Sequence, residues 1–302
     1  MNVKVFAELI ELKAKTASVF PFFMGLAYSL YHGNKVTLLP LFLYFIAMFL
    51  FNCFVDIWDN YNDYHNAIDT QDYQKNTNII GREKLEMRMI KGLLAFFFFS
   101  SLGIGLVVAA MTGWEVFFLG LICYAVGIFY AGGPKPLSTL PIGEGLSGLT
   151  MGYLIFLICV FISSSREFVW SFTTIGETFL VALPSVLLIS NLMLANNTCD
   201  LAEDEANERY TIVHYIGKKA ALYWWCGAIV LAYGAIFAAV ILHLISPVML
   251  ALVFLIPLII KLAKPYLNAQ NKRTTFICSV KILMIFSLLQ ALLMYVGLLF
   301  NF

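Results

Sequence analysis

The chain contains two similar stretches, Asn52-Cys-Phe-Val-Asp56-Ile-Trp-Asp59-Asn60 and Asn196-Asn-Thr-Cys-Asp200-Leu-Ala-Glu-Asp204, each at the end of a long apolar run. They lie 144 positions apart, residue 196 against residue 52, and each has an Asp four residues after its first Asn. Residues four apart share one helical face, where two like charges repel unless a positive group lies between them. Such charges are costly in a membrane and therefore indicate function. The two acidic clusters predict a paired divalent-metal site.

Composition identifies the surroundings of these clusters as a lipid bilayer. Of the 302 residues, 61% are apolar and 12% are charged, and the mean hydropathy is +0.85. A soluble domain has about 25% charged residues. The net charge of +1 gives no basic footprint for nucleic acid. We therefore expect a polytopic, all-α membrane protein with no nucleic-acid partner, folded as a single transmembrane domain over residues 1–302.

Apolar runs close to the spanning length of about 20 residues predict nine transmembrane helices. A short amphipathic stretch at residues 3–12, ahead of the first run, predicts an interfacial helix. The runs occupy residues 17–31, 38–57, 92–112, 115–131, 142–162, 178–198, 220–243, 247–263 and 280–301.

The basic residues predict the orientation in the membrane. If the N-terminus is cytoplasmic, 17 of the 19 Lys and Arg residues fall on the inner side, as the positive-inside rule requires. Lys35 and Arg166 are left for the outer side, where the C-terminus also lies. Both acidic stretches then lie at the cytoplasmic ends of the second and sixth helices. Because four helices separate them, the repeat is parallel: two four-helix units followed by a ninth helix.

The loops that follow the acidic stretches, at residues 58–91 and 199–219, are polar and basic. Mg²⁺ binds through one or two carboxylates together with substrate phosphates. Lys and Arg side chains can neutralise the remaining phosphate charge. This combination at a membrane surface predicts a binding site for a diphosphate with Mg²⁺.

The two acidic stretches resemble those of a known family, the UbiA-type intramembrane prenyltransferases. Within this family they most resemble the 1,4-dihydroxy-2-naphthoate polyprenyltransferase branch. Four further stretches carry the likeness. Residues 11–25 are similar to the branch's E-x-R-P-K-T followed by Pro and Gly, and residues 130–134 are similar to its Y-x-x-G-P. Residues 141–144 are similar to its G-E, and residues 208–211 to its G-K-x-T.

The resemblance implies nine helices around a central cavity. It also implies Mg²⁺-dependent transfer of a polyprenyl group from polyprenyl diphosphate to dihydroxynaphthoate, with release of diphosphate and CO₂ and formation of demethylmenaquinol at the cytoplasmic face of the cell membrane. Three groups of site residues are expected. They are the metal ligands Asp56, Asp59, Asp200 and Asp204, the further catalytic residues Lys15 and Arg82, and the substrate-binding residues Asn52, Asn196, Asn197, Asp63, Lys13, Tyr130, Glu144 and Arg209.

Other interpretations of these residues remain open. The carboxylates can be solvated helix ends, and any inner Lys or Arg can serve the positive-inside rule alone. The acceptor can be another aromatic compound, as in 4-hydroxybenzoate or haem-farnesylating enzymes of the same superfamily. An ion-coupled transporter also uses membrane carboxylates, but transporters commonly show inverted repeats with charges near the bilayer midplane. Prenyl length, the preferred metal ion and the oligomeric state are not determined by the sequence.

The orientation can be tested with membrane-impermeant thiol reagents on introduced cysteines. A cysteine at position 166 should react in intact cells, whereas cysteines at positions 75 and 270 should react only after permeabilisation, because the basic loops face inward. Labelling in the opposite order would reverse the orientation and remove the cytoplasmic active site.

Overall fold

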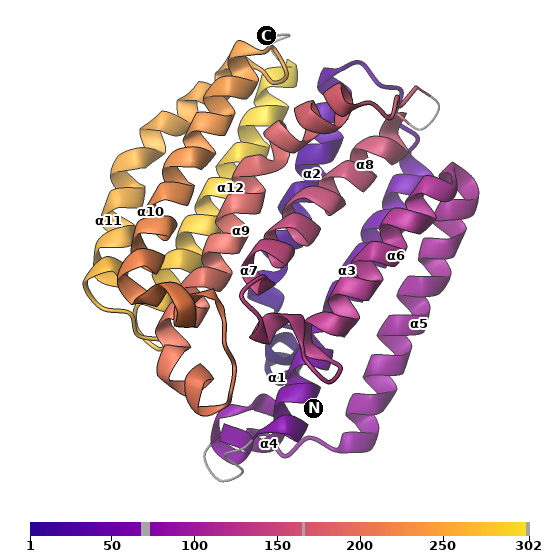
Figure 1. Cartoon of the computed structure of the whole chain (residues 1–302). Coiled ribbons are helices and arrows are strands. Elements are labelled where there is room, and N and C mark those ends of the chain that lie inside the picture. The colour runs from indigo at the N-terminus through magenta and orange to yellow at the C-terminus, as the bar shows by residue number, and fades with distance from the viewer. Residues whose placement is uncertain (68–72, 165–166, 300–302) are drawn as a thin grey trace. The chain divides into compact units, whose positions relative to one another are not determined.

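The computed structural model describes residues 1–67, 73–164 and 167–299, and over these ranges the chain is helical and has no strand (Figure 1). Arg166, which the sequence places outside, lies beyond the described residues. Short 3-10 and π-helical segments are labelled η. In chain order the elements are α1 (Val3–Leu9), η1 (Leu12–Lys15), α2 (Thr16–Tyr31), α3 (Leu38–Asn66), η2 (Tyr73–Thr77), α4 (Ile79–Arg82), α5 (Met87–Thr112), α6 (Trp114–Ala131), η3 (Leu137–Thr139), α7 (Gly143–Ser147), η4 (Gly148–Leu154), α8 (Ile155–Ser164), α9 (Phe172–Ala206), α10 (Ile212–Ile241), η5 (Pro247–Leu255), α11 (Ile256–Asn268) and α12 (Phe276–Leu299).

Every predicted apolar run coincides with helix in the described ranges. Eight helical stretches there are long and apolar enough to cross a membrane. The first run forms α2, which has 16 residues and is shorter than a typical span. The prediction of an all-α, multi-pass membrane architecture is confirmed. The count of nine spans, the central cavity, the single domain and the parallel repeat stay predictions.

The chain divides into two compact units. Unit 1 comprises residues 1–15 and 39–140, and unit 2 comprises residues 16–38 and 141–302. The first acidic stretch belongs to unit 1 and the second to unit 2, so each is described within its own unit.

In unit 1 the apolar part of α3 packs through aromatic side chains. Phe51 stacks on Tyr124 of α6 with ring centroids 3.9 Å apart, and Phe54 contacts Phe98 of α5 at 5.2 Å. The helices α5 and α6 lie side by side and form a tight hairpin around Gly113 (Figure 1).

Two glycines of the Tyr-Ala-Gly-Gly-Pro motif are explained by packing and backbone conformation. Trp58 donates a hydrogen bond from Nε1 to the carbonyl of Ile128 at 2.9 Å. A Cβ at Gly132 would lie 2.7 Å from that indole nitrogen, so a larger residue would displace Trp58. Gly133 has φ +92°, a conformation that glycine adopts without strain. The motif therefore fixes the end of α6 against α3.

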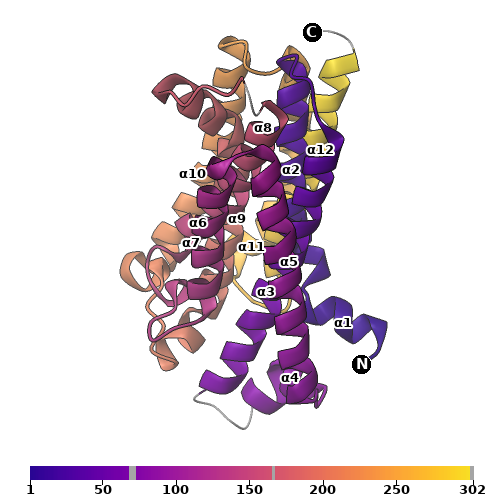
Figure 2. The ribbon, with the colours of Figure 1, turned by 90° about the vertical axis from the view of Figure 1, so that its right-hand side faces the viewer.

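The interfacial helix predicted at the N-terminus is α1, which Figure 2 shows crosswise to α3 and α5. Val5, Leu9 and Ile10 are buried in a cluster that includes Ile57 of α3 and Ile90 of α5. This apolar anchor holds the segment that follows α1, which carries Lys15, against the end of α3.

In unit 2 the longest helix, α9, packs against α10, η4, α7 and α12, and Figure 1 shows α9, α10 and α12 running together. Two glycines of the π-helical segment η4 allow a very close approach. A Cβ at Gly152 would lie 2.6 Å from the backbone nitrogen of Val186, and one at Gly148 would lie 2.4 Å from the Val186 carbonyl oxygen. Small residues four apart are a common helix-packing surface in membranes, and here they set the position of α7 against α9.

Gly152→Ala should lower the free energy of unfolding in detergent by about 1–3 kcal/mol, because the added methyl group overpacks the contact with α9. Gly176→Ala is the matched control, since a Cβ at Gly176 meets nothing within 4 Å. It should leave stability unchanged or raise it by up to about 1 kcal/mol through helix propensity. Equal effects of the two variants would contradict the close-packing account.

Candidate active site

The first acidic stretch holds a lysine between an amide and a carboxylate. Asn52 and Asp56 lie one turn apart on α3. Lys15, at the end of η1, donates from Nζ to Asn52 Oδ1 at 2.5 Å and to the Asp56 carboxylate. The Lys15 side chain is 4% exposed and that of Asp56 is 19% exposed. A cation therefore occupies the position between these two side-chain oxygens.

The rest of the first stretch continues along α3. Asp59 and Asp63 are half-buried and follow Asn52 and Asp56 at helical spacing, so the four side chains share one face. The Asn60 side chain bonds to the helix backbone instead: its nitrogen donates to the carbonyl of Asp56 at 2.9 Å. Its role is to support the helix end.

Arg82 forms an ion pair with α1. Its Nη2 lies 2.6 Å from Glu8 Oε1, and its Nε lies 3.2 Å from Glu83 Oε1. The Glu8 carboxylate raises the pKa of the Arg82 guanidinium further above its ordinary value. In this structure Arg82 ties α4 to α1, and its predicted catalytic role would require it to leave Glu8.

Two further predicted residues of unit 1 are less defined. The backbone of Lys13 belongs to η1, but its side chain lies outside the described residues. Tyr130 is half-buried on the last turn of α6, two residues before Gly132, which packs against Trp58. Their predicted substrate contacts stay predictions.

The second acidic stretch repeats the lysine arrangement within unit 2. Asn196 and Asp200 lie one turn apart on α9. Lys272, from the loop between α11 and α12, donates from Nζ to Asn196 Oδ1 at 2.5 Å and to the Asp200 carboxylate. Here the lysine side chain is 45% exposed. Both acidic stretches thus hold a cation between the first Asn and the Asp that follows it.

The end of α9 brings together two other predicted residues. Arg209 Nε lies 3.2 Å from Asp204 Oδ1, and the Arg209 backbone nitrogen donates to the Asp204 carbonyl at 2.8 Å. The turn between them uses Glu208 at φ +56°. Asp204 is buried, so Arg209 balances the charge of a buried carboxylate.

Glu144 and Asn197 form a buried pair between α7 and α9. The Asn197 side-chain nitrogen donates to Glu144 Oε1 at 2.7 Å, and both residues are about 5% exposed. Asn197 therefore supports α7, one residue beyond the Asn that contacts Lys272.

Lys272 is a site residue that the sequence does not predict. In the sequence it is one of many basic residues in the inner loops, and the position that follows Lys15 by the repeat offset of 144 is Cys159. The two lysines reach equivalent positions from opposite directions along the chain, so no sequence repeat connects them.

The side-chain oxygens suit a metal ion. Within residues 1–67, 73–164 and 167–299, no three His, Cys, Asp or Glu side chains gather as metal ligands. Each Asn/Asp pair nevertheless already holds an ammonium group. Mg²⁺ requires only one or two carboxylates when substrate phosphates complete its coordination, so the donor set fits that ion.

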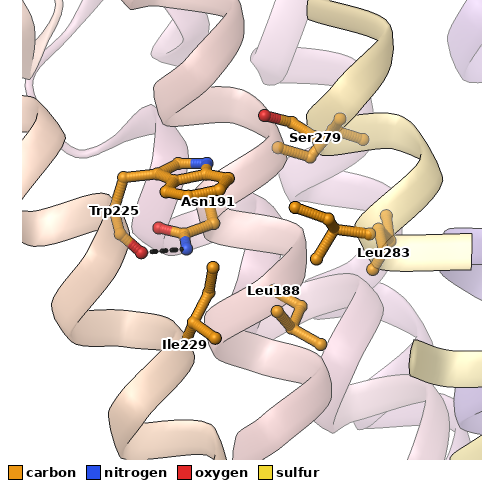
Figure 3. Close-up of a pocket in the computed structure, with 8 residues that line it drawn as sticks. Leu188, Asn191, Trp225, Ile229, Ser279 and Leu283 are labelled. Carbon is orange, nitrogen blue, oxygen red and sulfur yellow. Dashed lines mark hydrogen bonds between the residues drawn. The ribbon is translucent and has the colours of Figure 1, made fainter. Parts of the chain in front are cut away.

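A small cavity in unit 2 lies apart from these residues, among α9, α10 and α12 (Figure 3). Asn191 crosses it and donates to the Trp225 carbonyl at 2.7 Å, while Leu188, Ile229 and Leu283 form apolar walls. Its volume of about 10 Å³ has room for about one water. It cannot hold an aromatic acid or a prenyl chain.

Comparisons with known proteins agree with this chemistry. The profile described as "UbiA prenyltransferase family" matches residues 18–283. The 1,4-dihydroxy-2-naphthoate octaprenyltransferase of Bacillus subtilis (strain 168) is 26% identical over 260 residues, which are 84% of this chain and 79% of that protein.

Solved structures share the fold. A UbiA homolog from Archaeoglobus fulgidus bound to GPP and Mg²⁺ superposes with a TM-score of 0.67 at 13% identity, covering 97% of this chain and 99% of that one. A UbiA homolog from Aeropyrum pernix K1 gives 0.67 at 16% identity, covering 93% and 97%. A structure of digeranylgeranylglyceryl phosphate synthase gives 0.66 at 22% identity, covering 98% of each chain.

The two lysines should contribute differently to stability. Lys15→Met should lower the free energy of unfolding by about 3–5 kcal/mol, because it leaves the Asp56 carboxylate without its buried counter-charge. Lys272→Met, at an exposed pair, should cost about 1 kcal/mol or less.

Thermal or denaturant unfolding of the purified protein measures both effects. The Lys15→Met/Asp56→Asn double variant should recover most of the loss, since an amide needs no counter-charge. A double variant as unstable as Lys15→Met alone would mean that Lys15 acts through packing and not through its charge.

Proposed function

This chain belongs to the UbiA prenyltransferase family, and on that premise we propose that it transfers a polyprenyl group from polyprenyl diphosphate to 1,4-dihydroxy-2-naphthoate. The products are diphosphate, CO₂ and demethylmenaquinol. The chain is a multi-pass membrane prenyltransferase. The naphthoate acceptor is supported by the naphthoate octaprenyltransferase to which the chain is similar.

One observation carries the proposal: both acidic stretches hold a cation between an amide oxygen and a carboxylate. Prenyl transfer begins when the bond between the allylic carbon and the diphosphate oxygen breaks and the electron pair leaves with the diphosphate. The positive charges that stabilise this leaving group must therefore be in place beforehand. When bound, Mg²⁺ supplies such charge as a Lewis acid, and Asp56, Asp59, Asp200 and Asp204 are its proposed ligands.

The protein's own residues supply the remaining functions. Lys15, held by α1 and η1, presents a fixed ammonium group beside Asp56. Asn52 and Asn196 orient the lysines, and Arg209 neutralises Asp204. We propose that Asn197, Asp63, Lys13, Tyr130 and Glu144 bind substrate, and that Arg82 contacts diphosphate after leaving Glu8.

The ring carbon that carries the carboxylate then attacks the allylic cation and forms a carbon–carbon bond. Loss of the ring carboxylate as CO₂ returns an electron pair to the ring, so aromaticity is restored without a base that removes a ring proton. Apolar helix walls would hold the prenyl chain and keep water from the cation. We propose that this site faces the cytoplasm, with the N-terminus inside and the C-terminus outside, and that both clusters serve it.

Product analysis tests the acceptor directly. Membranes containing the protein receive one polyprenyl diphosphate with dihydroxynaphthoate, 4-hydroxybenzoate or haem in separate reactions, and products are identified by mass spectrometry. We expect a product only with dihydroxynaphthoate, with a mass that shows loss of CO₂. Prenylated 4-hydroxybenzoate or haem without any naphthoate product would refute the proposed acceptor.

The metal requirement is tested by chelation. Activity should need Mg²⁺ in the millimolar range and should disappear with EDTA, because carboxylates alone repel a diphosphate. Adding Mg²⁺ back should restore it. Undiminished turnover in thoroughly chelated membranes would exclude the metal from the reaction.

Asp56→Asn and Asp200→Asn should each reduce turnover by far more than tenfold, since a metal contact contributes several kcal/mol and about 1.36 kcal/mol corresponds to a factor of ten. Asp200→Asn should fold normally, because its lysine partner is exposed. Asp56→Asn leaves the buried Lys15 without its counter-charge and should lose stability, so turnover is compared per amount of folded protein. The controls are Glu86→Gln, at the N-cap of α5, and Glu205→Gln, in the last turn of α9. Both remove exposed carboxylates outside the acidic stretches and should stay near wild type. More than about a tenth of wild-type turnover in both Asp variants would refute the paired-metal site.

A further inference from the structure

Lys272 reaches the second acidic stretch from a loop whose shape is fixed by its own hydrogen bonds. Asn271 Oδ1 accepts from the backbone nitrogens of Arg273 and Thr274 at 3.0 and 3.1 Å. Thr275 Oγ1 closes the loop by donating to the Ala269 carbonyl at 2.7 Å. An exposed lysine is thereby presented from an ordered turn.

The Lys272 side chain also contacts an aromatic ring. Its Nζ lies 5.2 Å from the centre of the Phe276 ring, a cation–π contact, and it also bonds to Asn196 and Asp200. Contacts from three residues, Asn196, Asp200 and Phe276, thus hold one surface ammonium group. A side chain present only to satisfy the positive-inside rule would need none of them.

The same arrangement at Lys15 argues against a chance ion pair. Lys15 precedes its Asn and Asp partners by 37 and 41 residues, whereas Lys272 follows its partners by 76 and 72 residues. Two unrelated segments therefore deliver an ammonium group to the same pair of oxygens in each acidic stretch.

We propose that Lys272 is a positioning residue that occupies the cation position of the second acidic stretch in the substrate-free protein and yields it when prenyl diphosphate binds. An ammonium and a divalent cation compete for the same Asp200 carboxylate. An arriving diphosphate offers the ammonium another anion, and the carboxylate becomes available to the metal. This rests on the proposed function, and it makes metal and diphosphate bind cooperatively.

Exposure identifies Lys272 as the lysine that can move. Its side chain is 45% exposed, against 4% for Lys15. A lysine has a flexible four-carbon stem, and an exposed ion pair costs little to break. Lys15 is buried and leaves its partners less readily, so the exchange is assigned to the second acidic stretch.

Binding of Mn²⁺ to the purified, full-length, substrate-free protein tests the proposal, followed by electron paramagnetic resonance. Lys272→Met should bind Mn²⁺ about fivefold or more tightly than wild type, the scale of a typical coupling between sites. Arg273→Met is the matched control, because it removes the same charge from the neighbouring exposed residue and should bind like wild type. Lys272→Arg keeps a cation and should also stay close to wild type.

Steady-state kinetics distinguish a role of Lys272 in receiving the diphosphate from a purely structural role. In Lys272→Met the KM for geranyl diphosphate should rise while kcat changes less, because the displaced ammonium no longer receives the diphosphate. If Lys272→Met does not fold, Asn271→Ala carries the test: it loosens the loop and should shift Mn²⁺ affinity in the same direction.

Unchanged or weaker Mn²⁺ binding in the variant that folds would overturn the proposal. The Mn²⁺ titration needs neither an acceptor nor turnover. Tighter binding without any naphthoate product would therefore refute only the proposed function, and naphthoate product with unchanged Mn²⁺ binding would refute only the role of Lys272.

Discussion

A carboxylate that is shielded from water at the end of an apolar helix is costly unless a cation lies beside it, and much of this structure follows from that constraint. Asp56 and Asp200 each lie one turn after an Asn, and each pair holds a lysine ammonium between its oxygens. The charge is balanced in the resting protein, although the same oxygens suit a metal ion. A site for a highly charged diphosphate can therefore exist in a bilayer without leaving buried charge uncompensated.

The two lysines balance this charge in different ways. Lys15 is buried and is held by the apolar anchor of α1, so it belongs to the folded core of unit 1. Lys272 is exposed and is held by an ordered turn and an aromatic ring. A buried ion pair resists exchange, whereas an exposed one is readily broken. The same contact can thus serve stability in one unit and substrate response in the other.

Close packing through glycine gives these polar contacts their precision. Gly148 and Gly152 bring the backbone of η4 onto α9, and directly before η4 the Glu144 carboxylate meets Asn197. In unit 1, Gly132 accepts the indole of Trp58 at the end of α6. Helices in lipid gain little from the hydrophobic effect between them, so close backbone contact and buried hydrogen bonds position them.

The apolar helices, the two acidic stretches and their likeness to prenyltransferases can be predicted from the amino-acid sequence, because helix formation and side-chain periodicity depend on near neighbours. Lys15 and Asp204 can be predicted as site residues in the same way. The fold is needed to see that Lys272 contacts Asn196 and Asp200, that Arg82 pairs with Glu8, and that Asn197 bonds to Glu144. Each of these contacts joins residues between 53 and 76 positions apart, and such distances are closed by helix packing, which no local pattern encodes.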